Sequence, residues 1–186
     1  MFSPQLWLIQ LSGYSLPANE KLKPRNSGHT VVLELPESPA ITSGYTQQYQ
    51  AMQLYLHWGS LSGPSLEHTI NRCHFAVEIH VVHCNTKYDS FKEAMVYPDG
   101  LTILRAFLEA SPIVQPWVRR GKEVLVPGFN ITGLLPANLK LYFHYSGSPT
   151  TPSCYQWMVF NQGILLSHEQ MSVLVISLRN NDSKCR

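Results

Sequence analysis

Charged residues are scarce in this sequence: they make up 14% of 186 residues, whereas 44% are hydrophobic. A chain of this length and composition can bury a sizeable core, which excludes a disordered protein and favours one globular domain over residues 1–186. Its 14 Lys and Arg are scattered and nearly balanced by 12 Asp and Glu. The sequence therefore indicates no basic surface for nucleic acid or anionic lipid, and we expect a small or neutral partner.

Long apolar runs are missing as well. No stretch approaches the ~20 apolar residues that a membrane-spanning helix needs. The first residues, Met1–Ile9, have neither the basic start nor the cleavage site of a signal peptide. We therefore expect a soluble chain without a membrane span and without an export signal of its own.

Two further features bear on the compartment and leave it open. The cysteines contain no C-x-x-C pair, which argues against a zinc ribbon or a thioredoxin-like motif; they are Cys73, Cys84, Cys154 and Cys185. Glycosylation tripeptides begin at Asn130 and Asn181, but such tripeptides also arise by chance. Neither feature decides the redox state or the glycosylation of the chain.

Proline and glycine divide the sequence into short segments, which suits strands better than helices. Helical signals are weaker, at Ser90–Met95 and in the capping-box pattern of Ser167–Gln170, and residues 111–121 have the composition of a loop. Five segments are rich in β-branched and aromatic residues, several with period-two alternation: Thr30–Leu35, Tyr49–Trp58, Phe75–Val82, Leu141–Tyr145 and Trp157–Phe160. The pattern predicts a β-dominated α+β fold.

Two of these segments carry histidines, and their spacing indicates a metal site. Tyr55 and His57 are two apart and project from one face of a strand, and Glu78 and His80 do the same on the next. If the two strands are neighbours, the imidazoles converge. Catalytic zinc takes three protein ligands and a water, with amides or carboxylates behind the imidazoles, a role open to Gln53 and Glu78. By spacing alone, such histidines are more often packed or surface residues than ligands.

Three consecutive motifs, Gln53–Ser60, Glu67–Thr69 and Glu78–His83, resemble in order and spacing the zinc-site motifs of the α-type carbonic anhydrases. The likeness is greatest to the secreted and membrane-anchored branch, which implies a location facing the cell exterior. It implies one domain around a large, mostly antiparallel twisted sheet that hydrates carbon dioxide reversibly to bicarbonate at Zn²⁺. It continues through Asn85–Tyr88, Pro98–Leu101, Val126–Asn130, Leu134–Pro136 and Tyr145–Pro152.

The resemblance also implies a role for each matching residue. His57 and His80 match zinc ligands, and Tyr55 stands where the family has its first ligand histidine. His68 and His83 match the pattern outside the ligand set, and we interpret both as structural. Further matches are His29 as proton shuttle, Thr150 orienting the zinc-bound hydroxide, Glu67 accepting the proton of Thr150, Gln53 and Glu78 supporting the ligands, and Val82, Ile103, Thr151 and Trp157 lining the carbon dioxide pocket. The pocket positions equally suit ordinary β-core packing.

Tyr55 departs from the family at the point that matters most. A phenol has an ordinary pKa near 10, and a neutral phenol is a poor metal ligand. A bound phenolate would offset part of the zinc charge and make the bound water less acidic. Tyrosine is also longer than histidine. We therefore expect weakened zinc binding and impaired hydration of carbon dioxide.

Compared with the family, the sequence reads as incomplete at both termini. The resemblance implies segments before Met1 and after Arg186, a shortened stretch between Glu109 and Val124, and a lost disulfide partner for Cys154. Three hypotheses follow: an impaired carbonic anhydrase, a zinc-free binding or interaction module similar to the acatalytic carbonic anhydrase-related proteins, or a truncated product without a stable fold. The sequence leaves the oligomeric state and any protein partner open.

Overall fold

The computed structural model describes residues 8–26, 30–42, 47–58, 77–109, 125–147 and 155–165. Strands dominate these ranges, which confirms the predicted β-dominated α+β fold. In chain order the elements are β1 (Leu11–Ser12), β2 (Lys21–Leu22), β3 (Pro24–Asn26), β4 (Thr30–Glu34), β5 (Ala40–Ile41), β6 (Tyr49–Trp58), β7 (Val77–Asn85), helix α1 (Phe91–Ala94), β8 (Leu101–Glu109), β9 (Val126–Pro127), the 3-10 helix η1 (Ile131–Leu134), β10 (Tyr142–Gly147) and β11 (Tyr155–Leu165).

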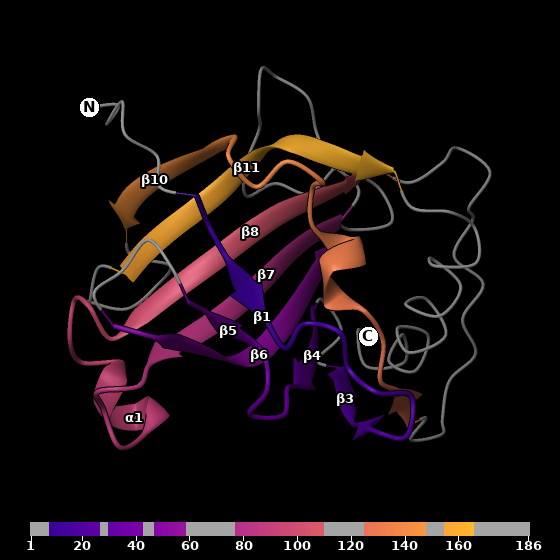
Figure 1. Ribbon diagram of the computed structural model, residues 1–186, viewed down its shortest axis with the longest axis horizontal. Coiled ribbons are helices and arrows are strands. Elements are labelled where there is room, and N and C mark those ends of the chain that lie inside the picture. Colours follow the sequence, from indigo (N-terminus) through magenta and orange to yellow (C-terminus); the bar gives the residue numbers. More distant parts are fainter. Residues whose placement is uncertain are drawn as a thin grey trace, which may run out of the picture.

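Among the described residues, nine strands form one curled sheet (Figure 1). Its order is β1-β5-β6-β7-β8-β11-β10, with β4 also paired to β6, and β3 paired to β4. The described pairings are antiparallel except that of β8 with β11. The large, mostly antiparallel sheet that the resemblance implied is thereby confirmed, and β6, β7 and β8 lie side by side at its centre.

Strand β7 is buried along its whole length because both faces of the sheet are covered. Ile79 and Val81 point into the main hydrophobic cluster on one face. Val82 and Cys84 point into a second cluster on the other face. Residues two apart share a face of a strand, so Glu78 and His80 lie on the side of the second cluster.

The sequence predicted six of these elements and missed the others, of which β8 is the longest; the predicted ones are β4, β6, β7, α1, β10 and β11. The strand predicted at Tyr49–Trp58 has those bounds, and Ser90 caps α1 by accepting a hydrogen bond from the Glu93 amide, as the predicted helical turn requires. Strand β8 was missed because it is apolar on both faces, and such runs do not alternate. The helical signal at Ser167–Gln170 and the loop at 111–121 lie outside the described residues.

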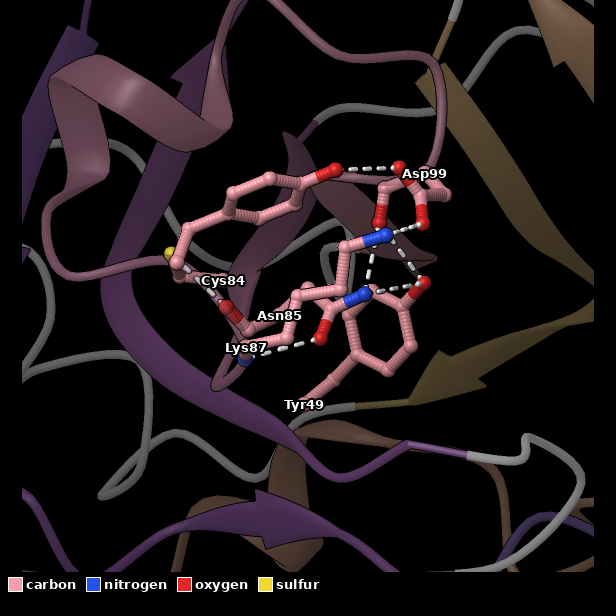
Figure 2. Close-up of polar contacts among 6 residues, drawn as sticks. Tyr49, Cys84, Asn85, Lys87 and Asp99 are labelled. Atoms are coloured by element: carbon pink, nitrogen blue, oxygen red, sulfur yellow. Dashed lines mark hydrogen bonds and ion pairs between the residues drawn. The ribbon is translucent and has the colours of Figure 1, made fainter.

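A polar cluster at one end of the central strands holds the connection from β7 to β8 (Figure 2). The Tyr49 hydroxyl and the Asn85 side-chain amide both donate to the backbone carbonyl of Asp99, at 2.8 and 3.0 Å. The Asp99 carboxylate accepts from Tyr88 at 2.7 Å and pairs with Lys87 at 2.5 Å. The cluster joins the start of β6, the end of β7 and the turn before β8, and so helps to fix the register of these strands.

The structure describes one cysteine, Cys84, and one asparagine of a glycosylation tripeptide, Asn130. Cys84 is a buried free thiol, and the other three cysteines lie outside the described residues. Asn130 is exposed and caps η1, its side-chain oxygen accepting from the Thr132 amide at 3.1 Å and the Thr132 hydroxyl at 2.7 Å; Asn181 lies outside the described residues. In the described part of the chain, no helix is long and apolar enough to span a membrane.

Candidate metal centre

Strands β6 and β7 bring the three positions predicted to bind metal onto one patch of the sheet. Tyr55 lies opposite His80 in the antiparallel register, and His57 lies opposite Glu78. The rings of His57 and His80 have centroids 4.5 Å apart, and the ring of Tyr55 stacks on His57 at 5.9 Å. The two imidazoles therefore converge as two facing strands predict.

One nitrogen of each imidazole faces a polar neighbour. Nδ1 of His57 lies 3.0 Å from the Thr30 hydroxyl on β4. Nε2 of His80 lies 3.4 Å from Oε2 of Glu78. A ligand histidine commonly has its second nitrogen held in this way, which sets the tautomer and ring orientation. The opposite ring nitrogens, Nε2 of His57 and Nδ1 of His80, are those a metal would use.

Tyr55 does not complete the set. Its hydroxyl donates a 2.5 Å hydrogen bond to Oε1 of Gln53, two residues back along the same strand. Burial raises the pKa of Tyr55, an effect only partly offset by the charge of Arg25. Even at the ordinary pKa near 10, ionising a phenol at pH 7 costs about 4 kcal/mol. Gln53 is thus engaged by Tyr55, and the phenol stays neutral.

Arg105 on β8 was not anticipated from the sequence. It lies opposite His80 in the β7–β8 register and is fully buried. Its Nη2 donates to Oε2 of Glu78, which is itself 1% exposed. The guanidinium carbon lies 5.3 Å from the ring centroid of Phe107. The signal in the sequence was a single arginine inside the otherwise apolar run of residues 101–108.

Oε2 of Glu78 therefore faces both Arg105 and His80. Burial by itself raises the pKa of Glu78, but hydrogen bonding with His80 and the charge of Arg105 outweigh it, so the pKa is lowered. The carboxylate is ionised at neutral pH and its charge is balanced within the protein by the guanidinium.

The predicted wall residues lie in a row beside the histidines. Val82 faces Ile103 across β7 and β8, and Ile103 faces Trp157 across β8 and β11. All three belong to the second cluster, and the rings of Trp157 and His80 are perpendicular, with centroids 5.6 Å apart. The remaining predicted site residues lie outside the described ranges: His29, Glu67, Thr150 and Thr151.

The described residues do not fit the zinc centre that the resemblance implies. Two imidazoles are suitably placed, but the third position holds a neutral phenol bonded elsewhere. Within the described ranges, no three His, Cys, Asp or Glu side chains are grouped so that they could hold a metal ion. A buried arginine also places a positive charge beside His80. The donor set and the charge both disfavour a dication.

Comparisons with known proteins agree on one family. The sequence model of eukaryotic-type carbonic anhydrases matches residues 1–185. Carbonic anhydrase 6 of Bos taurus is 34% identical over 98% of this chain and 62% of its own length. Carbonic anhydrase 12 of Homo sapiens is 36% identical over 95% of the chain and 54% of its own length, and human carbonic anhydrase 6 is 32% identical over 98% and 65%. The chain thus spans between half and two thirds of these relatives.

Proposed function

Because this chain belongs to the eukaryotic-type carbonic anhydrase family, we propose that it is a carbonic anhydrase domain whose zinc site is impaired by its own residues. The family reaction is the reversible hydration of carbon dioxide to bicarbonate at zinc. In this chain, Zn²⁺ binds weakly at His57 and His80, and hydration is slow or absent. Resemblance to the secreted and membrane-anchored branch supports a location facing the cell exterior.

The observation that supports the proposal best is the hydrogen bond from Tyr55 to Gln53. This bond holds the phenol oxygen next to Gln53 on strand β6. It also engages the amide oxygen that would otherwise support a ligand imidazole. A metal would have to break this bond and also ionise a phenol whose pKa is raised by burial. Both costs are absent when the position holds a neutral imidazole.

A second candidate function is a zinc-free binding or interaction module. The buried pair of Glu78 and Arg105 favours it, because the carboxylate behind His80 already has a counter-charge without any metal. The sheet and both hydrophobic clusters form from protein side chains alone. Such a domain retains a carbonic anhydrase fold as a scaffold for a partner rather than as a catalyst.

The test compares the native chain with Tyr55→His. Each purified protein is exposed to excess zinc and desalted, and its zinc content and stopped-flow rate of carbon dioxide hydration are measured. We expect the native chain to retain little zinc and show no hydration above the uncatalysed rate. Tyr55→His should retain more zinc, since it restores a third imidazole.

A matched control is Tyr97→His, which adds an imidazole at an exposed tyrosine beside α1. It should leave the zinc content unchanged and so exclude adventitious binding to any new histidine. One zinc per native chain together with rapid turnover would refute the proposal. A native chain without zinc or turnover that nevertheless melts cooperatively would favour the scaffold function.

A further inference from the structure

The charge of this site depends on a residue outside the ligand positions. Arg105 is fully buried, opposite His80 on β7 and opposite Val159 on β11. Among the described residues, its Nε and Nη1 have no hydrogen-bond partner. Since arginine is not deprotonated in proteins, a permanent positive charge lies in the sheet interior next to the predicted ligand.

We propose that Arg105 is a second cause of weak zinc binding, independent of Tyr55. Its guanidinium takes up the carboxylate of Glu78, which would otherwise support a cation bound at His80. The inference rests on the proposed loss of zinc binding and adds a residue to its cause. It predicts that Tyr55→His alone does not restore tight zinc binding.

One carboxylate oxygen of Glu78 is shared between His80 and Arg105. A carboxylate behind a ligand histidine increases the basicity of the imidazole and lends negative charge to the metal. Here Oε2 of Glu78 faces Nε2 of His80 at 3.4 Å and also accepts from Arg105. The carboxylate is therefore already neutralised, and its effect on His80 is reduced.

The guanidinium also acts directly on a cation. The side chains of Arg105 and Glu78 are 0% and 1% exposed, so solvent and salt screen their charges little. A dication at His80 would meet the repulsion of a fixed positive charge on the neighbouring strand. Its removal therefore increases metal affinity by restoring the carboxylate and by abolishing that repulsion.

A purely structural role makes a different prediction. If Arg105 only balances the charge of Glu78, its replacement changes stability but leaves the zinc affinity of the folded protein unchanged. A lysine at position 105 separates charge from shape, because it retains the positive charge without the planar guanidinium. Metal affinity is thus the decisive readout, and stability serves as its control.

The experiment uses the full chain carrying Tyr55→His, with Arg105→Met or Arg105→Lys added. Zinc dissociation constants are measured by competition with a chromophoric chelator, and melting temperatures with and without zinc. We expect Arg105→Met to tighten zinc binding roughly 10–100-fold, the size of effect known for residues behind metal ligands. Arg105→Lys and the exposed control Lys140→Met should bind zinc as the Tyr55→His parent does.

Equal zinc affinity of the parent and the Arg105→Met protein, with cooperative melting of both, would overturn the inference. Equal tightening by Arg105→Lys would overturn it too, because charge would then not be the cause. If Arg105→Met fails to fold with Glu78 unpaired, the same comparison is made with Glu78→Gln in both proteins, and a smaller tightening is expected because only the repulsion is then removed. Tight zinc binding by the native chain would instead refute the proposed function.

Discussion

His83 makes the stability of this fold sensitive to mild acid. It lies on the opposite face of β7 from His80, as strand parity predicts, and is fully buried. The Tyr14 hydroxyl is hydrogen-bonded to its Nε2. Burial raises the pKa of Tyr14 and lowers that of His83 from 6.5 to about 3. The folded protein therefore holds a neutral imidazole over the range in which the unfolded chain takes up a proton.

Proton linkage fixes the direction in which the stability of the fold changes with pH. Near and below pH 6.5 the unfolded chain binds more protons than the folded protein, so the free energy of unfolding falls as the pH is lowered. Between pH 7.5 and 5, the loss due to His83 is about 2 kcal/mol, set by the unfolded pKa and the slope of 1.36 kcal/mol per pH unit. Glu78 does not contribute in this range, because a carboxyl with a lowered pKa loses its stabilisation only below its ordinary value of 4.5.

The assay is urea unfolding at pH 7.5 and pH 5, comparing the native chain with His83→Gln. Glutamine retains an amide that can hydrogen-bond with the Tyr14 hydroxyl but does not titrate, so the difference between the two pH values should shrink by about 2 kcal/mol. Tyr14→Phe is the matched control: it should lower stability at both pH values by about 1–3 kcal/mol, since it leaves a buried ring nitrogen of His83 without its hydrogen-bond partner. An unchanged pH dependence in His83→Gln would refute the reasoning.

Two other substitutions test local structure, both by chemical denaturation. Asn130→Ala should cost about 1 kcal/mol of stability by removing the cap of η1. Asn130→Asp retains the acceptor and should cost little. Equal losses in the two variants would contradict the capping role. Gly100→Ala should cost about 1–3 kcal/mol, because the added Cβ would lie 1.8 Å from the backbone oxygen of Ala94. A stability equal to that of the native chain would contradict the close approach of Gly100 to α1.

The pairing of the two central strands was predictable from the sequence, for a physical reason. Tyr55 and His57 alternate with buried leucines, and an alternating strand with one buried face has only one acceptable register. Motif order then indicated that the strand containing His80 is the neighbour, and the structure places Tyr55 opposite His80. The roles of His29 and Thr150 stay predictions, because both lie outside the described residues.

The hydrogen bond of Tyr55 could be anticipated only in part. Its chemistry as a poor ligand follows from the phenol pKa alone. Its partner does not, because a side chain on a strand can turn toward the residue two before it, the residue two after it, or a neighbouring strand. Gln53 was predicted to support an imidazole, which stays a prediction; in the structure its amide oxygen accepts from the phenol.

Arg105 was missed because its significance depends on a third strand. Ligand motifs are visible in a sequence when residues two apart share a face. The positive charge that balances Glu78, however, comes from Arg105 on β8. The register of β8 against β7 follows from the connection held by Asp99. A slip of one residue in β8 would turn Arg105 to the opposite face, into the main hydrophobic cluster. A buried arginine without a carboxylate is far too costly there. The ion pair with Glu78 thus helps to specify the strand register, and the same contact that stabilises this register places a positive charge beside His80.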